Sequence, residues 1–241
     1  TNYNGKETGH IIGIYNKTIK YLSYNITPIY IFDGAPPENK KPLIEIRKKR
    51  ANEAKEKMLL NNNNTNEYNK YKKKSIRMNK SHIDDIKELL TYLGVSYIHK
   101  DVGEGEGIAS ELCRINYVDY VITEDMDSLV FGTPLLVRNC IDKSIKRNDV
   151  ITTINLSKIL IDLSMDQDEF IELCILCGCD YCDNIPRIGI KKAYSIIKQY
   201  KSIESYIKNN DDIIKKLHSN YIDQYRFSKK YFNSYKNIFD D

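Results

Sequence analysis

The sequence predicts an α/β protein with a mainly parallel central sheet flanked by helices. Short apolar runs of strand length alternate with helical segments as far as residue 154, which is typical of parallel sheets with crossover helices. From residue 155 onward the pattern is helical. The 241 residues suffice for a sizeable core, and 41% hydrophobic with 29% charged residues excludes a mostly disordered chain. No apolar run approaches the ~18 residues that a membrane span needs, so no membrane partner is expected.

Four apolar runs in the N-terminal two thirds have the length of strands. Each is short and is bounded by turn residues. The first, a continuous apolar run, is typical of a strand that is buried on both faces. The four runs lie at residues 29–32, 95–98, 120–122 and 135–137, and the last is expected to open a hairpin across residues 139–154.

Helical segments separate these runs. After residue 80 the apolar side chains fall on one face, Ser81 with Asp84 predicts an N-cap, and Gly94 marks the end of the helix. Four consecutive Asn at residues 61–64 are expected to form a mobile loop. The expected helices span residues 8–24, 43–60, 68–80, 81–93 and 107–116, and the third is expected to be helical only in context.

The formal net charge of +4 conceals two opposed segments. Residues 40–80 hold 14 Lys or Arg and four Asp or Glu, whereas residues 101–127 hold eight Asp or Glu and one Arg. One charge run is most often a solvated face, but two opposed runs flanking expected strands favour two separate roles. The basic segment suits a polyanion and the acidic segment suits a metal ion.

Acidic residues follow three of the expected strands. In open α/β sheets, functional sites form beyond the carboxyl ends of the strands. A single Asp in that place is most often a helix cap, but five acids at three successive strand ends are harder to explain in this way. Acids two residues apart share a face of extended backbone. The candidates are Asp33, Glu104, Glu106, Asp125 and Asp127.

This set of carboxylates predicts a particular chemistry. Five carboxylates brought together repel one another unless protons or cations intervene. Oxygen ligands without a nearby His favour Mg²⁺ or Mn²⁺ over Zn²⁺. Paired hard cations suit in-line displacement at phosphorus. The residues alone therefore predict a metal-dependent phosphodiesterase that acts on a polyanion.

Four ordered motifs resemble those of the flap endonuclease family of structure-specific 5′-nucleases, and the resemblance covers nearly the whole chain. The motifs are IYIFDGAPP at 29–37, TEDMDSLVFG at 123–132, FIELCILCGCDY at 170–181 and IPRIGIKKA at 185–193. The resemblance implies a PIN-like 5′-nuclease fold. It also implies hydrolysis of DNA phosphodiesters near single-strand/duplex junctions, as 5′ flap endonuclease and 5′–3′ exonuclease, in replication and repair.

The resemblance assigns roles to individual residues. It places Lys40 and Arg47 against the scissile phosphate, where their charge would stabilise the transition state, although both would also suit a solvated basic helix. It makes Asp33, Glu104 and Asp127 catalytic. It implies two Mg²⁺ ions, for which Mn²⁺ can substitute, bound by Asp33, Glu104, Glu106, Asp125, Asp127 and Asp180.

The resemblance also implies a domain organisation for binding DNA. Residues 1–154 match a nuclease core, with a helical arch at about 43–80 through which the 5′ flap threads. Residues 155–241 match a C-terminal helical DNA-binding region with a helix-hairpin-helix at about 180–199, which in the family also holds K⁺, and the two parts are expected to pack as one catalytic unit. Backbone amides of that turn would hold phosphates without reading sequence. The expected DNA-binding residues are Lys40, Arg47, Arg50, Lys72, Lys73, Lys74, Gly189, Lys191 and Lys192.

The sequence departs from the family pattern in several places. The family opens with a strand carrying a further catalytic Asp, and nothing here matches it, so about the first 50 residues of the pattern are expected to be missing. Gly105 and Gly107 stand where the family often has Ala, and Ile190 where it has Pro. Arg187 replaces a Gly and would either strain the turn or add a phosphate contact. A tail that binds a sliding clamp would lie beyond the last residue, and the resemblance implies a nuclear location.

Alternative interpretations stay open. Cys174, Cys177, Cys179 and Cys182 form C-x₂-C-x-C-x₂-C, which alone suggests a zinc or iron–sulfur site, although in an apolar helical run a free Cys behaves as a small hydrophobe. The chain could also be a DNA-junction-binding fragment without catalysis, or a processive 5′-exonuclease relative. Six Cys are too few for a disulfide-dense scaffold and favour a reducing, intracellular compartment.

Overall fold

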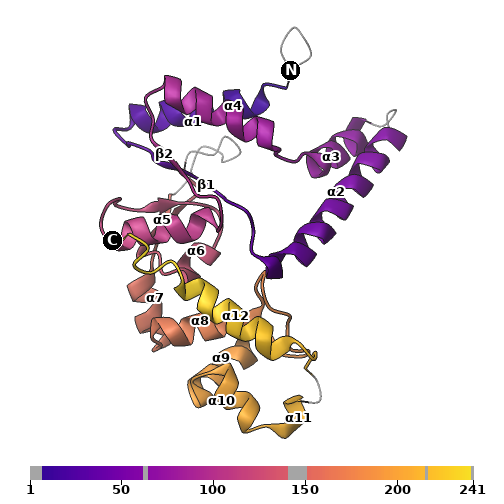
Figure 1. The fold of residues 1–241 in the computed structure, drawn as a ribbon, viewed down its shortest axis with the longest axis vertical. Helices are drawn as coiled ribbons and strands as arrows, with labels where there is room; N and C mark the ends of the chain where they lie inside the picture. Colours follow the sequence, from indigo (N-terminus) through magenta and orange to yellow (C-terminus); the bar gives the residue numbers. More distant parts are fainter. Residues whose placement is uncertain (1–6, 62–64, 141–150, 215–216, 240–241) are drawn as a thin grey trace. The chain divides into compact units, whose positions relative to one another are not determined.

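The computed structural model describes residues 7–61, 65–140, 151–214 and 217–239, and it confirms the α/β class (Figure 1). The chain divides into two compact units, which are considered one at a time. Unit 1 comprises residues 1–32 and 40–100, and unit 2 comprises residues 33–39 and 101–241. Within the described residues, no helix is both long enough and apolar enough to cross a bilayer.

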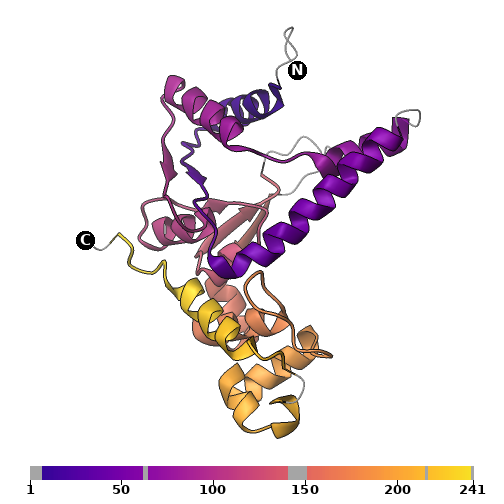
Figure 2. The same cartoon turned by 45° about the vertical axis from the view of Figure 1, so that its right-hand side comes forward.

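Unit 1 consists of two helix pairs and a two-stranded parallel sheet, in which Tyr30 lies opposite Tyr97. Helix α1 packs on α4, and α2 packs on α3 to form a helical hairpin (Figure 2). A single 3₁₀ turn at Glu38–Lys40 leads into α2. The elements are α1 (Gly9–Ser23), β1 (Tyr30–Phe32), α2 (Lys41–Leu60), α3 (Thr65–Ser75), α4 (Lys80–Tyr92) and β2 (Tyr97–His99).

The core of unit 1 forms around α4 and the strands. Ile86, Leu90 and Val95 are buried together, with Tyr30 and Phe32 of β1 packed against them. Val95 thus belongs to this cluster, and β2 begins two residues beyond the expected start of the strand. By contrast, α3 buries none of its side chains, and α2 buries only two alanines. The α2–α3 hairpin is therefore held by little apolar packing.

The expected N-cap of α4 is wrong by two residues. Asn79 is the N-cap, and its side-chain oxygen accepts a hydrogen bond from the His82 amide at 2.9 Å. Ser81 lies inside the first turn, because an Asn at the extended position before the helix satisfies that amide instead. The predicted end at Gly94 is confirmed, since Gly94 takes the left-handed conformation with φ +66°.

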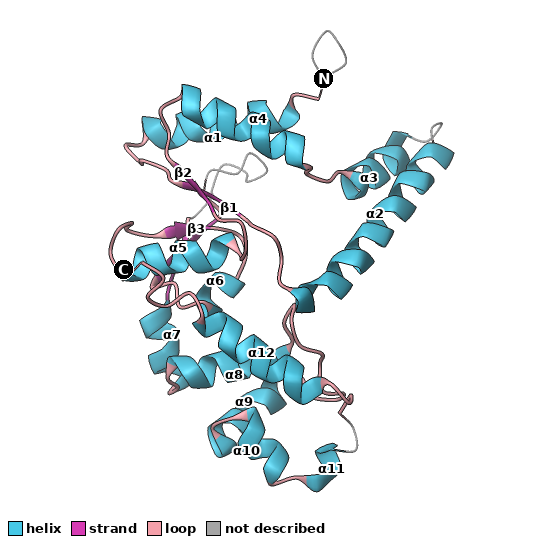
Figure 3. Ribbon diagram, in the orientation of Figure 1, coloured by secondary structure: helices cyan, strands magenta, loops and turns pink. Residues whose placement is uncertain are grey.

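Unit 2 contains a three-stranded sheet followed by a helical region (Figure 3). Strands β3 and β4 are parallel, and β4 and β5 are antiparallel with Leu136 opposite Ile154. The elements are α5 (Gly105–Arg114), β3 (Val121–Ile122), α6 (Asp127–Val130), β4 (Leu135–Arg138), β5 (Thr152–Asn155), α7 (Leu156–Leu163), α8 (Gln167–Cys177), α9 (Ile190–Tyr200), α10 (Ile203–Lys208), α11 (Asp211–Ile214) and α12 (Tyr221–Asn233).

All four expected strands are present, but they form two sheets and not one. In the described parts of the chain, β1 pairs only with β2, and β3–β4–β5 form a separate sheet. An apolar run marks a strand but not which strand lies beside it, so the sequence could not distinguish these arrangements. The burial on both faces that was expected of the first strand is wrong, since all three residues of β1 are only half-buried. The antiparallel pairing expected of the hairpin is confirmed by β4 and β5. Its connection at 141–150 and most of the Asn run, 62–64, lie outside the described residues.

Helix α8 forms the centre of the helical region of unit 2. Ile171, Ile175 and Leu176 are almost completely buried, and Glu172 between them is 1% exposed. The Glu172 carboxylate accepts three hydrogen bonds: from the Ile203 amide at 3.1 Å, the Tyr225 hydroxyl at 2.7 Å and the Lys229 ammonium at 2.7 Å. A buried carboxylate with this many partners is compensated, and it ties α10 and α12 to α8.

Candidate active site

The site is assembled in unit 2, where two chain segments run side by side. The Ala35 amide donates to the Asp101 carbonyl at 2.7 Å, and the Gly103 amide donates to the Ala35 carbonyl at 3.1 Å. Just beyond this pairing, the Gly105 amide donates to Asp33 Oδ1 at 2.7 Å. Asp33 therefore satisfies the first amide of α5. This bond draws Asp33 to the N-terminus of α5, where Glu104 is the N-cap and Glu106 lies in the first turn, so the expected extended backbone across this pair of acids is wrong.

Glu106 shows that the carboxylates share one electrostatic environment. Burial raises the pKa of Glu106 to about 7, and the negative charge of Asp33 adds to the rise. Asp125 and Glu104 raise this pKa by smaller amounts. Four of the five carboxylates predicted from spacing therefore lie close enough to act on one another, as expected of a site in which a cation would relieve the repulsion.

Asp125 has a local structural role at the start of a helix and also belongs to the group of candidate carboxylates. It follows β3, and its Oδ1 accepts the Asp127 amide at 2.9 Å at the start of α6. The Thr123 hydroxyl oxygen in turn accepts the Asp125 amide at 3.1 Å. Asp125 thus lies directly before Met126, the N-cap of α6, and accepts the first helical amide. It also contributes to the shared negative charge around Glu106.

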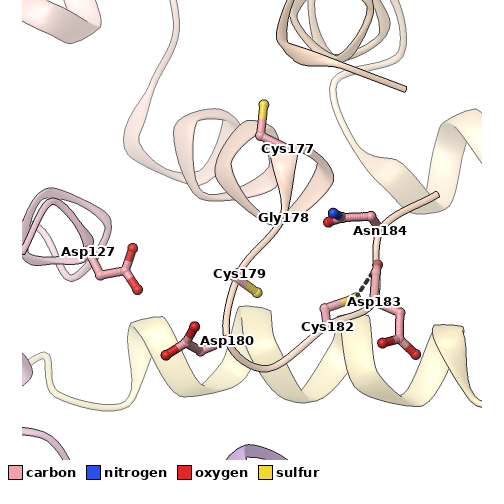
Figure 4. Close-up of a pocket in the computed structure, with 8 residues that line it drawn as sticks. All are labelled: Asp127, Cys177, Gly178, Cys179, Asp180, Cys182, Asp183 and Asn184. Atoms are coloured by element: carbon pink, nitrogen blue, oxygen red, sulfur yellow. Dashed lines mark hydrogen bonds between the residues drawn. The ribbon is translucent and has the colours of Figure 1, made fainter. Parts of the chain in front are cut away.

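Asp127 and Asp180 face a common open cleft of about 450 Å³. Figure 4 shows their two carboxylates turned toward one another from α6 and from the turn that follows α8. The turn depends on Gly178, which has φ +115° and whose missing Cβ would lie 2.3 Å from the Asn184 side-chain oxygen. The structure therefore brings Asp180, which spacing did not reveal, beside Asp127.

The four cysteines of the motif at 174–182 lie where burial disfavours their thiolate forms. Burial raises the pKa of Cys174 and of Cys182 to about 12, so both thiols keep their protons at neutral pH. The thiolate is the form that binds zinc, and a buried apolar environment opposes it. The zinc or iron–sulfur alternative gains no support from the thiols.

The carboxylate donors fit a hard divalent cation by their chemistry. They are all oxygen ligands, and their mutual repulsion is visible at Glu106. Among the residues that the structure describes, however, no three His, Cys, Asp or Glu are arranged to hold one metal ion. Within the described residues, the structure thus brings negative charges together but does not arrange the carboxylates around a single ion.

The expected DNA-binding residues divide between the units. Those of unit 1 lie on or directly before the α2–α3 hairpin: Lys40, Arg47, Arg50, Lys72, Lys73 and Lys74. In unit 2, Gly189 is the N-cap of α9, and Lys191 and Lys192 are exposed on its first turn. Arg187 was expected either to strain the turn or to add a phosphate contact. In the turn before α9 its φ is +64°, a left-handed conformation that strains the backbone of a non-glycine residue.

Sequence reasoning missed two tyrosines that contact Glu104. The Tyr181 hydroxyl donates to Glu104 Oε2, and the Glu104 amide donates to the Tyr235 hydroxyl oxygen at 2.6 Å. Burial first, and then the bond to Glu104, raises the pKa of Tyr181, so its hydroxyl stays protonated and remains a donor. The only available signal was the position of Tyr181 directly after Asp180 in a recognised motif, and nothing in the sequence points to Tyr235.

Two family models match the chain and together cover more than half of it. The XPG N-terminal domain matches residues 1–54, and the XPG I-region matches residues 94–180. The chain is 38% identical over 234 residues to flap endonuclease 1 of Plasmodium knowlesi, and the match covers 92% of this chain and 39% of that protein. It is 40% identical over 211 residues to flap endonuclease 1 of Glycine max, and the match covers 87% of this chain and 55% of that protein. The chain thus spans about half the length, or less, of these relatives.

Solved structures show the same architecture. Flap endonuclease-1 from Methanococcus jannaschii is 29% identical, with a TM-score of 0.67 over 98% of this chain and 70% of that one. The catalytic core of Rad2 in complex with DNA substrate is 23% identical, with a TM-score of 0.64 over 92% of this chain and 64% of that one, and it shows the fold alone.

Proposed function

Because the chain belongs to the flap endonuclease family, we propose that the protein hydrolyses DNA phosphodiesters near single-strand/duplex junctions, as a structure-specific 5′ flap endonuclease with 5′–3′ exonuclease activity. The observation that carries the proposal is the shared negative charge at Glu106, to which Asp33, Asp125 and Glu104 contribute. A phosphodiester cannot approach such a charge without a cation, so the arrangement favours metal-assisted phosphoryl chemistry over simple binding.

The carboxylates would hold two Mg²⁺ ions, or Mn²⁺ in their place. When bound, such ions supply an activated water and stabilise the entering and leaving oxygens. Asp33 and Asp125 are already oriented by backbone amides, and Asp127 and Asp180 share the cleft. The residues proposed to bind the ions are Asp33, Glu104, Glu106, Asp125, Asp127 and Asp180.

The basic residues would bind and orient the DNA. Lys40 and Arg47 would offset charge at the scissile phosphate, and the α2–α3 hairpin would follow the single strand through Arg50 and its lysines. Helix α9 would hold duplex phosphates through amides near Gly189, with Lys191 and Lys192 and with K⁺ at the turn. We propose the functional division at residues 1–154 and 155–241 on the same grounds.

The cellular location and the protein partner are proposed from the family alone. The protein would act in the nucleus in replication and repair, and a sliding clamp would recruit it to DNA junctions. The solved complex of Rad2 with a DNA substrate supports DNA as the partner of this fold. None of the described helices could cross a membrane.

The direct test is cleavage of a labelled 5′-flap duplex by the 241-residue chain, with Mg²⁺ and with EDTA. Incision at the junction that requires Mg²⁺ is the expected result. Faster trimming of a blunt 5′ end than of a flap would favour the processive exonuclease. Junction-selective binding without incision, in Mg²⁺ and in Mn²⁺, would favour the binding fragment without catalysis.

A further inference from the structure

Glu104 is held from two sides by tyrosine hydroxyl groups that come from distant parts of the chain. Its carboxylate accepts a hydrogen bond from Tyr181, 77 residues away, and its amide donates to Tyr235, 131 residues away. Glu104 is only 8% exposed, and Tyr181 is 2% exposed. Both contacts lie within unit 2. A side chain fixed at its carboxylate and at its own backbone has little freedom to change its orientation.

The two tyrosines are themselves locked in an aromatic cluster around the C-terminal end of α12. Tyr231 lies 4.9 Å from Tyr181 between ring centroids, and its hydroxyl oxygen is 2.9 Å from that of Tyr235. Phe131 and Phe232 also belong to the cluster, with ring centroids 5.2 Å from Tyr235 and 5.5 Å from Tyr181 respectively. Since α12 is tied to α8 through Glu172, the positions of both hydroxyl groups are set by the helical packing of unit 2.

Two glycines make room for Tyr235. A Cβ at Gly107 would lie 2.5 Å from a ring carbon of Tyr235, and a Cβ at Gly103 would lie 2.4 Å from its hydroxyl oxygen. Non-bonded carbon atoms do not approach so closely, so a larger residue at either position would displace the ring. The contact accounts for Gly107, one of the departures from the family pattern.

We propose that Tyr181 and Tyr235 are positioning residues that hold the Glu104 carboxylate in the orientation required to bind a divalent cation. The inference rests on the proposed function, because it needs Glu104 to be a metal ligand. Groups that hydrogen-bond a metal ligand orient it, and their loss typically costs about 10- to 100-fold in metal affinity. The turns that follow α8 and α12 therefore set the metal affinity of a site whose ligands lie mostly elsewhere in the chain.

Metal affinity is a property that a purely structural tyrosine would leave unchanged. The experiment is a Mn²⁺ titration of the 241-residue chain without DNA, followed by electron paramagnetic resonance. Tyr181→Phe is expected to raise the Kd for Mn²⁺ about tenfold or more. Tyr225→Phe is the matched control, because Tyr225 is equally buried and also donates to a buried Glu, but to Glu172, so its Kd is expected to match the wild type.

The backbone contact is tested without metal by hydrogen exchange of the amides at residues 103–107. Tyr235→Phe removes the acceptor of the Glu104 amide, and Gly107→Ala displaces the ring that carries it. Both variants are expected to exchange faster there than the wild type, and Tyr225→Phe is expected to exchange at the wild-type rate.

The outcomes separate the inference from the function on which it rests. Wild-type Mn²⁺ affinity in a folded Tyr181→Phe variant would overturn the positioning role of Tyr181 and leave the proposed function intact. Unchanged exchange in Tyr235→Phe would overturn the role of Tyr235. Failure of the wild-type chain to bind Mn²⁺ would overturn the metal site itself, and the inference with it.

Discussion

The raised pKa of Glu106 shows that several carboxylates lie close together and repel one another. This pKa rises to about 7 because Glu106 is half-buried and because Asp33, Asp125 and Glu104 place negative charge near it. The ordinary value is 4.5, so the folded chain binds this proton more tightly than the unfolded chain does. In the absence of divalent cations, the contribution of Glu106 to the free energy of unfolding therefore falls as the pH rises between these two values.

Glu106→Gln should remove this pH dependence. Below the ordinary Glu pKa, the group is protonated in both states and contributes nothing to the pH dependence, whereas above about 7 the full unfavourable contribution is present. The gain in unfolding free energy of Glu106→Gln over the wild type should thus grow across this window. Urea unfolding in EDTA at a series of pH values measures it. Glu53→Gln, on the exposed surface of α2, is the control, and a gain at Glu106 that stays constant with pH would contradict the assignment.

Arg187 occupies a backbone conformation that suits glycine. Its φ is +64° and its side chain is exposed, so left-handed strain is not offset by burial. Arg187→Gly should raise the free energy of unfolding by about 0.5–1 kcal/mol, because the strain exceeds the extra entropy of an unfolded glycine. Chemical denaturation measures the change.

The matched control is Gln199→Gly, an exposed position inside α9. There the same replacement should lower stability by about 1 kcal/mol, since the backbone is helical. Loss of stability in Arg187→Gly would show that the Arg side chain stabilises the turn by more than the strain costs.

At the scale of elements, the α2–α3 hairpin and the helical region of unit 2 differ in what holds them. Helix α3 buries no side chain, whereas α8 is buried along most of its length. The lysines of α3 are therefore not required for packing and remain available for a polyanion. In α8, even a carboxylate is taken into the core, because Glu172 finds three donors there.

Replacing Lys72, Lys73 and Lys74 together by Ala should flatten the salt dependence of DNA binding. Each lost phosphate contact should reduce the log–log slope by about 0.9 on duplex or about 0.7 on single strand. Ala favours helix, so α3 should persist, which circular dichroism checks. Lys17→Ala with Lys20→Ala on α1 is the control, and an unchanged slope in the triple variant would place these lysines away from the DNA.

At the scale of the whole molecule, the candidate carboxylates and the lysines of the α2–α3 hairpin belong to different units. The candidate metal ligands all lie in unit 2, and the basic hairpin lies in unit 1. Chemistry and much of the DNA affinity should therefore be separable by substitution.

Asp127→Ala should abolish cleavage of the flap substrate while leaving DNA binding largely intact. Asp127 faces the cleft beside Asp180, and its replacement removes a proposed metal ligand without touching the basic side chains of unit 1. Parallel cleavage and binding assays on the same flap duplex measure the two effects. Asp223→Ala, an acid in the first turn of α12, is the control and should cleave normally. Turnover at the wild-type level in Asp127→Ala would remove it from the site.

Local patterns in the sequence were sufficient for the α/β class, the strand positions and five of the six candidate carboxylates. These features depend on periodicity and on turn residues near in the chain, which any single segment displays. Asp180 needed the family motif, because it follows a helix and not a strand. The N-cap at Asn79 was missed because two neighbouring residues compete for the same role.

Only the tertiary structure decided what surrounds Glu104 and how the strands pair. Tyr235 is 131 residues from Glu104, and no local pattern encodes a contact across that separation. The raised pKa of Glu106 likewise depends on burial, on charges from two other segments (Asp33 and Asp125) and on the charge of neighbouring Glu104. Residue types and local spacing therefore determined which groups can do the chemistry, whereas packing of distant helices decided how they are held. A hydrogen bond and an electrostatic field depend on distance in space and not on distance along the chain.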